Sequence, residues 1–355
     1  MTQIRWGIFG TGLMARRFAA DIKLSKTGVL VAVASRDPAR AQAFAAPGIA
    51  ALASYEALAQ SDAVDAIYVA TPNATHKDLC ILALRGGKGV LCEKPIATHP
   101  ADLEEILAEA EKAGRVCLEG LWTAFLPGFA EIRAHLARGT LGELRQAHAS
   151  LGFAHLERQG DPITDPALGG GAVLDLGIYC VGLLNHLLGP GALVAGDVTR
   201  SASGSIRNAT AYLRHKGASG EAIQSSVAVS HDAILPCRLE LTGTRGRIEV
   251  ESLFIQAEKA KLWQFEPISY GAGHPSAGAL RQVKNLKILK KVKNTLKPLL
   301  RPGGIPLACD YGGTGFQFQI DEIGACLAAK RIESAVHPLR DSLKTLKLLH
   351  KISDL

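Results

Sequence analysis

The 355-residue sequence has no apolar run close to the roughly 20 residues that a membrane-spanning helix needs. Its first residues, MTQIRWGIFG, lack the basic, apolar and small-residue regions of a signal peptide, so we expect a cytoplasmic protein. The seven cysteines show neither CxxC nor histidine-rich spacing, which predicts no zinc site and no disulfide framework. The sequence also lacks internal repeats and long low-complexity linkers.

One segment combines an absence of acidic residues with a high density of basic ones. Residues 281–301 hold eight of the 40 Lys and Arg, and the other 32 nearly match the 33 acids, so the net charge of +7 is local. Apolar residues recur there at helical spacing, at Val283, Leu286, Leu289, Val292, Leu296 and Leu299. We interpret about 278–302 as a basic helical insertion. It is either a solvated helix docked by its apolar stripe or a surface for anionic lipid or a partner protein. Nucleic acid is not an expected partner, because the segment has no aromatic residue for stacking.

The chain is longer than one hydrophobic core usually organises, so we expect two domains. Short apolar runs alternate with helical stretches in the first third, as in a parallel sheet with crossover helices. The expected strands there are 4–9, 29–34, 66–70, 89–92 and 115–118. Later strands are expected at 209–215, 222–229, 238–242 and 247–250, with helices at 129–137, 316–329 and 341–352. We predict an α/β Rossmann domain with a doubly wound parallel sheet over 1–121. An α+β domain with an open, mostly antiparallel sheet is expected over 122–355.

A glycine motif follows the first expected strand. In IRWGIFGTGLMA, Gly10, Gly12 and Ala15 form GxGxxA at a strand-to-helix turn. The first glycine permits the tight turn, the second lets the backbone approach a pyrophosphate, and the third position packs the helix on the strand. We therefore expect a dinucleotide against residues 10–14, namely Gly10, Thr11, Gly12, Leu13 and Met14. An ordinary strand-to-helix turn is the alternative.

The end of the second strand bears on the choice of dinucleotide. An NAD site carries an acid here for the ribose 2′-hydroxyl, whereas this chain has Ser35 and Arg36. A hydroxyl and a guanidinium suit a 2′-phosphate, with Arg40 as a further contact. We predict NADP(H), with NAD(H) as the alternative. Asp37 keeps that alternative open, because its carboxylate can either cap the next helix or reach a ribose.

The next polar loop, YVATPNATH, ends another apolar strand. Ligands of open α/β sheets lie outside the carboxyl ends of the strands. We expect Thr71, Pro72, Asn73 and His76 to face the cofactor. Helix capping by Asn73 or Thr75 is the alternative, and it needs no ligand.

The segment GVLCEKPIATHP places Glu93 and Lys94 at the same edge, one strand further along. Pro95 restricts Lys94 to extended backbone, which sets the direction of its side chain. A fixed ammonium beside a nicotinamide can hydrogen-bond a substrate oxygen and lower the pKa of a neighbouring acid or base. We expect both residues at the cofactor. A solvated strand end is the alternative interpretation of Lys94.

A second polar cluster lies in GGGAVLDLGIYCVGLLNH, residues 169–186. Asp175, Tyr179 and His186 are spaced by four and then seven residues, near one helix face. Gly177 and Gly182 each cost about 1 kcal/mol relative to alanine within a helix, so a close approach is expected there. The alternative is a packed helix between domains whose polar residues only cap or hydrogen-bond.

The ordered set GIFGTGLMA, ATPNATH, EKP and GGGAVLDLGIY resembles the glucose-fructose oxidoreductase, inositol dehydrogenase and MocA family of NAD(P)-dependent oxidoreductases. The resemblance covers nearly the whole chain. It is strongest for the branch of trans-1,2-dihydrobenzene-1,2-diol dehydrogenase and NADP-dependent D-xylose dehydrogenase. It implies a Rossmann domain followed by an α+β domain with an open sheet, and assembly into a homodimer or tetramer through that sheet.

The resemblance also implies roles for individual residues. Lys94 takes the place of the catalytic lysine, joined to its proline by a cis bond, and Tyr179 that of the general acid or base. Asp175 would orient the substrate or Tyr179, and Trp122 and Phe125 of GLWTAFLP would line the substrate site with these three. We expect the ammonium to lower the tyrosine pKa from about 10. The implied activity is hydride transfer between NADP(H) and a secondary alcohol or ketone of a sugar or cyclic diol. A non-catalytic regulator that senses dinucleotide or sugar is the alternative.

Overall fold

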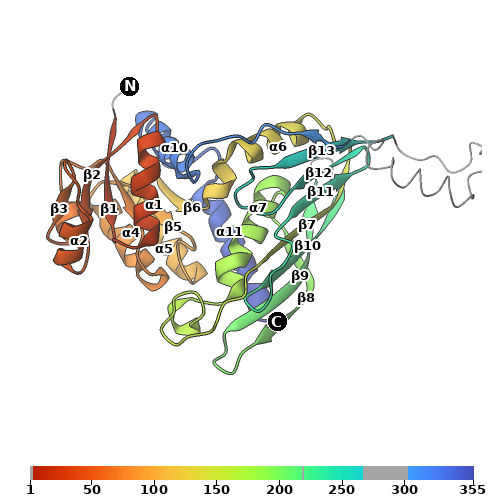
Figure 1. Ribbon diagram of the computed structural model, residues 1–355, viewed down its shortest axis with the longest axis horizontal. Coiled ribbons are helices and arrows are strands. Elements are labelled where there is room, and N and C mark those ends of the chain that lie inside the picture. Colours follow the sequence, from red (N-terminus) through yellow and green to blue (C-terminus); the bar gives the residue numbers. More distant parts are fainter. Residues whose placement is uncertain (1–2, 218–219, 267–302) are drawn as a thin grey trace, which may run out of the picture.

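The computed structural model describes residues 3–217, 220–266 and 303–355. The predicted basic insertion, about 278–302, lies entirely outside these residues. Two sheets dominate the fold, one formed by the first third of the chain and one by the remainder (Figure 1). The helix α11 (Leu339–Ser353) and the helix α7 (Ile178–Leu188) lie between them.

The first sheet has six parallel strands in the order β3-β2-β1-β4-β5-β6. Their bounds are β1 Ile4–Phe9, β2 Gly28–Ala34, β3 Ala50–Leu52, β4 Ala66–Val69, β5 Gly89–Glu93 and β6 Cys117–Gly120. The connecting helices are α1 Leu13–Asp21, α2 Pro38–Phe44, α3 Tyr55–Ala59, α4 His76–Arg85 and α5 Pro100–Ala113. Every residue of β4 and β5 is buried, because helices cover both faces of a parallel sheet. The predicted doubly wound α/β sheet is confirmed.

Two details of this sheet differ from the sequence-based expectation. Strand β3 was not predicted, since it is three residues long and only partly buried, and so shows no apolar run. Strand β6 begins two residues later than the expected 115–118. Arg115 instead precedes the strand, after the left-handed Gly114 that ends α5.

The second sheet has eight strands in the order β14-β13-β12-β11-β7-β10-β9-β8. Their bounds are β7 Leu144–Gly152, β8 Ala192–Arg200, β9 Ile206–Lys216, β10 Ala222–Ser230, β11 Leu239–Gly243, β12 Gly246–Val250, β13 Ala260–Gln264 and β14 Ile305–Pro306. Among the strands that the structure describes in this sheet, only β7 and β10 pair in parallel, so the prediction of a mostly antiparallel sheet is confirmed. Strand β9 alternates buried and exposed residues from Ala209 onward, as expected when one face meets a core.

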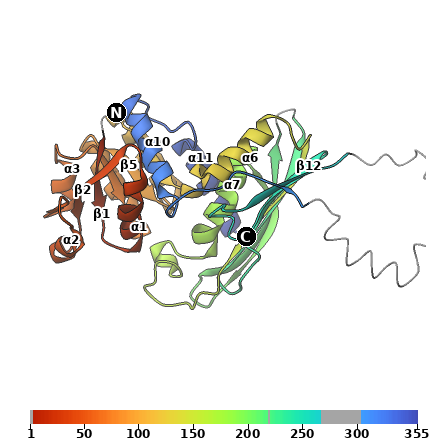
Figure 2. The ribbon, with the colours of Figure 1, turned by 45° about the horizontal axis from the view of Figure 1, so that its top comes forward.

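Helices of the second half connect the two sheets. Both α7 and α11 pack against the inner face of the eight-stranded sheet, and the helix α6 (Pro127–Ala137) lies near its upper end (Figure 2). The helix α10 (Phe316–Ala328) crosses back and packs on α1 and β5. Asp321 of α10 accepts hydrogen bonds from Ser25 and Thr27, which fasten it to the start of β2. One hydrophobic cluster therefore contains residues of both halves.

All seven cysteines are buried free thiols. Across the ranges that the structure describes, no three His, Cys, Asp or Glu side chains are grouped as metal ligands would be. Over the same ranges, no helix has both the length and the apolar character that a membrane span requires.

Candidate active site

The glycine motif forms an open cradle at the end of β1. Gly10 has φ +107°, and a Cβ on it would lie 2.5 Å from the carbonyl oxygen of Ala70, so the turn itself requires glycine. Gly12 begins α1 with φ −76° and ψ −168°, which any residue can adopt, and no atom lies within 4 Å of its ideal Cβ. Neither its backbone angles nor a close neighbour among the described residues requires that second glycine. A pyrophosphate at the positive end of α1 does explain it, so the cradle fits the predicted dinucleotide.

A cavity of about 490 Å³ opens beside the cradle, at the carboxyl edge of the sheet. It brings together the loops that follow β1, β2 and β4. Its lining residues are Gly10, Thr11, Gly12, Ser35, Arg36, Asp37, Arg40, Tyr55, Ala70, Thr71 and Pro72. The remaining predicted cofactor residues, Leu13, Met14, Asn73, His76, Glu93 and Lys94, are not part of this lining. Tyr55 was not predicted, because it follows β3, which the sequence did not reveal.

The acid at the end of β2 is used within the chain. Asp37 precedes α2, and its Oδ1 accepts a hydrogen bond of 2.9 Å from the backbone N–H of Ala39. Of the two roles considered for this carboxylate, helix capping is the one observed. Arg36 and Arg40 are exposed and form no ion pair within the described residues. Their guanidinium groups are therefore free to bind an anion.

His76 joins the two loops on either side of the site. It has no exposed surface, its Nε2 lies 2.8 Å from the carbonyl oxygen of Thr71, and its Nδ1 lies 2.8 Å from that of Pro95. Burial lowers the pKa of the imidazole, whereas the two carbonyl contacts act in the opposite sense. The expectation that His76 faces the cofactor needs correction. Both ring nitrogens are occupied, so the side chain fixes the loops rather than offering a ligand contact.

Lys94 follows β5 and reaches across to the second half of the chain. Its Nζ donates hydrogen bonds to Oδ1 (2.8 Å) and to the backbone oxygen (2.9 Å) of Asp175. The same Nζ lies 4.8 Å from the ring centroid of Tyr179, at cation–π distance. The peptide bond between Lys94 and Pro95 is cis. Lys94 is thus in contact with two residues of one distant segment, Asp175 and Tyr179, which the resemblance placed at the same centre.

A π-helical turn, Val173–Gly177, precedes α7 and carries Asp175. Tyr179 lies one turn further along, buried at 7% exposure. Its hydroxyl accepts a hydrogen bond of 3.1 Å from Nε1 of Trp122. His186 does not join this group by any contact that the described residues form. It lies 2.8 Å from Arg133 instead and packs edge-on to His337.

The residues around the centre are themselves held by buried contacts. The indole of Trp122 stacks on Phe316 of α10, with ring centroids 5.9 Å apart. Glu93 is buried directly before Lys94 and accepts a hydrogen bond from the hydroxyl of Tyr68. Phe125, also predicted at the substrate, is 9% exposed. Trp122 is therefore held in place beside Tyr179.

Electrostatic interactions determine the charge states of Lys94 and Asp175, the central pair of the site. Burial raises the pKa of Asp175, but Lys94 and His231 more than offset this and hold it well below its usual range. Burial lowers the pKa of Lys94, but the Asp175 carboxylate outweighs it and the pKa lies above its ordinary value. Both groups are charged at neutral pH.

Tyr179 corrects one expectation. Burial raises the pKa of its phenol above the ordinary value, although Lys94 and the bond from Trp122 act to lower it. The net direction is opposite to the expected one, because the desolvation of a phenolate outweighs one ammonium nearby. At neutral pH the phenol therefore keeps its proton.

His231 is a member of the site that sequence reasoning missed. It follows β10, has no exposed surface, and its Nε2 lies 3.2 Å from Oδ2 of Asp175. No local motif marks it, since it is 56 residues from Asp175 in sequence. Only the pairing of β10 with β7 places it beside the π-helical turn.

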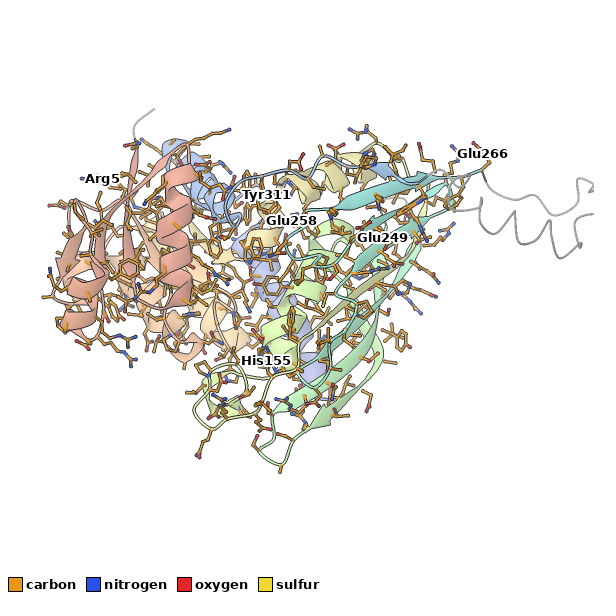
Figure 3. The ribbon with its side chains drawn as sticks, in the orientation of Figure 1. Arg5, His155, Glu249, Glu258, Glu266 and Tyr311 are labelled. Carbon is orange, nitrogen blue, oxygen red and sulfur yellow. The ribbon has the colours of Figure 1, made fainter. Side chains whose placement is uncertain are left out.

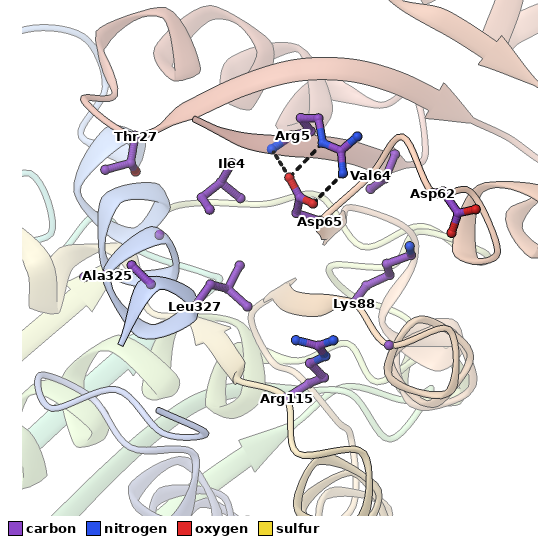
Figure 4. Close-up of a pocket in the computed structure, with 13 residues that line it drawn as sticks. Ile4, Arg5, Thr27, Asp62, Val64, Asp65, Lys88, Arg115, Ala325 and Leu327 are labelled. Atoms are coloured by element: carbon purple, nitrogen blue, oxygen red, sulfur yellow. Dashed lines mark hydrogen bonds and ion pairs between the residues drawn. The ribbon is translucent and has the colours of Figure 1, made fainter. Parts of the chain in front are cut away.

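A larger cavity, of about 790 Å³, lies at the amino edge of the parallel sheet, beside α10 (Figure 4). The guanidinium group of Arg5 is paired with Asp65, and Nζ of Lys88 donates to the carbonyl oxygen of Ser61. No predicted site residue lines this cavity. Ligands of doubly wound sheets lie at the carboxyl edge, so the smaller cavity is the one that matches the dinucleotide.

The fold and the glycine cradle define a dinucleotide-binding oxidoreductase. Residues 4–121 match the family described as "Oxidoreductase family, NAD-binding Rossmann fold", and residues 129–249 match the GFO/IDH/MocA C-terminal domain. The chain belongs to the GFO/IDH/MocA family of NAD(P)-dependent oxidoreductases. The resemblance stated from the sequence, the enzyme class and the nicotinamide dinucleotide are confirmed.

Individual relatives cover most of the chain. The trans-1,2-dihydrobenzene-1,2-diol dehydrogenase of Macaca fascicularis is 31% identical over 358 residues, 98% of this chain and 96% of that protein. The scyllo-inositol 2-dehydrogenase (NADP(+)) IolU of Bacillus subtilis (strain 168) is 33% identical over 259 residues, 70% of this chain and 76% of that protein. Among solved structures, KijD10, a 3-ketoreductase from Actinomadura kijaniata in complex with NADP and TDP-benzene, has a TM-score of 0.76. It is 22% identical, and the match covers 99% of this chain and 97% of that one, which supports the fold.

Proposed function

We propose that the protein transfers a hydride between NADP(H) and a secondary alcohol or ketone of a sugar or cyclic diol. The observation that carries the proposal is the contact of Lys94 with both Asp175 and Tyr179. This contact places an ammonium and a phenol from distant segments at one centre. Both side chains are available in the charge states that carbonyl chemistry needs.

Tyr179 is the proton donor in the direction of reduction. When bound, the nicotinamide supplies the hydride to the carbonyl carbon. The phenol keeps its proton at neutral pH and delivers it to the carbonyl oxygen, so the ketone becomes an alcohol. In the reverse direction the hydroxyl proton returns to the phenolate, whose formation the ammonium of Lys94 favours.

Lys94 and Asp175 act as a fixed charge pair. The ammonium of Lys94 uses two of its three hydrogens on Asp175, and the third is available for the substrate oxygen. Negative charge that develops on that oxygen in the transition state is stabilised by the ammonium. Asp175 holds the ammonium in place, so its role in the proposal is to orient Lys94.

The preference for NADP(H) is supported by the pocket at the end of β2. Ser35, Arg36 and Arg40 line it, and neither guanidinium group forms an ion pair in the ranges that the structure describes. Asp37, the one acid in the lining, caps α2. A 2′-phosphate would meet two cations and a hydroxyl, while Oδ1 of the carboxylate is engaged at the start of α2. The names of the relative IolU and of the KijD10 complex both include NADP, which agrees with this preference.

The substrate class follows from the relatives, whose names specify a dihydrodiol and an inositol. Each has adjacent hydroxyl groups on a ring. In the same proposal, residues 1–121 bind the dinucleotide, and residues 122–355 bind substrate and assemble a homodimer or tetramer through the eight-stranded sheet. Large apolar side chains are exposed on the last two strands of that sheet, at Val194 of β8 (55%) and Tyr212 of β9 (56%). Light scattering after gel filtration measures the assembly.

The proposal is tested by replacing Tyr179 with phenylalanine. We expect Tyr179→Phe to bind NADPH as the wild type does and to lose turnover by about 100-fold or more across a panel of keto-sugars, inosones and cyclic diols. The matched control is Tyr311→Phe, which also removes a phenol hydrogen bond, to the backbone of Gln256, away from the central contacts. Unchanged turnover in Tyr179→Phe removes it from the mechanism. A wild type that binds NADPH but turns over nothing in the panel favours the sensing regulator instead.

A further inference from the structure

A buried hydrogen bond lies behind the central pair. Asp175 is ionised and can only accept hydrogen bonds, so Nε2 of His231 carries the hydrogen and donates it to Oδ2 at 3.2 Å. Oδ1, the other carboxylate oxygen, accepts from Lys94 at 2.8 Å. Each oxygen therefore has its own charged or polar partner.

His231 keeps this contact at a cost. Its Nδ1 is buried and has no hydrogen-bond partner in the part of the chain that the structure describes. Such an atom loses its contacts with water and gains nothing in return. An apolar residue of similar size would avoid the cost, so packing alone does not explain a histidine here.

One residue of the neighbouring strand holds the backbone of His231 on both sides. The backbone carbonyl oxygen of Arg207, in β9, accepts a hydrogen bond of 2.7 Å from the backbone N–H of His231. Its guanidinium Nη2 donates to the carbonyl oxygens of His231 (2.8 Å) and His155 (2.6 Å). Nε of the same guanidinium donates to Asp232 at 2.9 Å. His155, labelled in Figure 3, also packs edge-on against the imidazole of His231, with ring centroids 5.2 Å apart. The backbone of His231 is therefore fixed by Arg207, and its imidazole packs against that of His155.

We infer that His231 is a positioning residue for the hydride transfer, acting on Lys94 through Asp175. The inference depends on the proposed function. By occupying Oδ2, the imidazole prevents the carboxylate from rotating and taking the ammonium with both oxygens. Lys94 then stays at the distance observed from the Tyr179 ring and keeps one hydrogen for the substrate.

Removing the donor should affect the chemical step more than binding. We expect His231→Leu to reduce kcat roughly 10- to 100-fold, the usual effect of losing a hydrogen bond to a charged group. The affinity for NADPH should not change, because the glycine cradle and the β2 pocket lie elsewhere. His231→Gln should recover most of kcat, because its amide N–H can reach Oδ2. His231→Asn should not recover it, because its amide is one carbon shorter.

The matched control is His215→Leu. His215 is also buried in the same sheet, at 2% exposure, and its two nitrogens contact Gly189 and Ser225 rather than any member of the site. We expect this variant to lose stability but to keep kcat within about twofold of the wild type. The inference is overturned if His231→Leu keeps kcat equally well, or if His231→Gln is no better than His231→Leu. If His231→Leu does not fold, kcat of His231→Gln is compared with kcat of His231→Asn instead, and equal values overturn the inference.

A measurement without turnover separates this inference from the proposed function. Proton–nitrogen NMR of histidine-labelled protein identifies which ring nitrogen of His231 carries the hydrogen, with His231→Gln assigning the signal. We expect the Nε2–H form, and a change in its nitrogen shift in Asp175→Asn. A hydrogen on Nδ1 alone overturns the contact. If the expected spectrum accompanies a wild type that reduces no panel substrate, the contact stands while the role in hydride transfer is lost together with the proposed activity.

Discussion

Replacing Gly12 with alanine separates a ligand requirement from a folding requirement. The position has ordinary backbone angles and no neighbour within 4 Å of a Cβ, so the added methyl group meets only open space. Alanine is a poorer N-cap than glycine by several tenths of a kcal/mol. It also restricts the unfolded chain, which returns about 0.4–1 kcal/mol. We expect the free energy of unfolding to change by less than about 1 kcal/mol.

The effect on the dinucleotide should be much larger. The methyl group occupies the space through which a pyrophosphate reaches the first N–H groups of α1. Crowding of about 1–3 kcal/mol and the loss of a hydrogen bond to a charged group, about 1.5–3 kcal/mol, together weaken binding by about 2.5–6 kcal/mol. That corresponds to a factor of roughly 70 or more in Kd.

Fluorescence titration with NADPH and denaturant unfolding with and without it measure the two effects. At 100 times the wild-type Kd, NADPH should stabilise the wild type by about 2.7 kcal/mol and Gly12→Ala by about 0.5 kcal/mol or less. Gly10→Ala should instead destabilise the free protein by several kcal/mol, because its Cβ meets the carbonyl oxygen of Ala70 at 2.5 Å with φ at +107°. Gly312→Ala, another site with nothing within 4 Å, should change neither quantity. Wild-type affinity in Gly12→Ala would refute the cradle.

Three further outcomes are expected. Arg36→Ala should weaken NADPH roughly 10- to 100-fold and leave NADH within about twofold, measured by titration of both, and equal losses would reject the 2′-phosphate contact. Lys94→Met should abolish turnover and, by leaving the Asp175 carboxylate without its ammonium, should lower the free energy of unfolding by about 2–4 kcal/mol. The double variant Lys94→Met with Asp175→Asn should recover part of the lost free energy of unfolding. No recovery would show that the unpaired carboxylate is not the cause of the loss. Burial, together with His337 and Arg133, lowers the pKa of His186 to about 3. An unfolded histidine titrates near 6.5, so between about pH 6.5 and 3 only the unfolded state gains a proton and stability falls as the pH drops. In His186→Gln the loss of unfolding free energy between pH 7 and pH 5 should be smaller by about 1–2 kcal/mol, and an equal loss would contradict the burial of a neutral imidazole.

Local interactions made much of the first half predictable. The turn between β1 and α1 requires glycine at position 10 because the backbone there has a positive φ. The neighbouring apolar strands β1 and β4 are buried on both faces. Such features appear in the sequence because neighbouring residues produce them. Short or exposed strands carry no such signal. Strand β8 is exposed along most of its length, so its residues show no alternation that could mark it.

The charge states of the site were beyond sequence reasoning. The pKa of Tyr179 rises because the phenol is buried among aromatic residues, and burial is a property of the packed chain. The sequence left two roles open for Asp37, capping a helix or reaching a ribose. The structure shows that its carboxylate accepts a hydrogen bond from the backbone N–H of Ala39, at the start of α2. Likewise, no motif distinguishes His76, which fixes two loops, from a histidine that binds a ligand.

The sequence by itself determined the class of this protein, since the glycine turn, the polar strand ends and the order of the motifs are local properties of the chain. The tertiary structure alone decided the chemistry of the centre. Lys94 and Asp175 are 81 residues apart, and His231 lies 56 residues beyond Asp175. Their contacts exist because β10 pairs with β7 and α7 packs between the sheets. Pairing and packing join distant residues through the burial of whole surfaces, and no single segment of sequence encodes that burial.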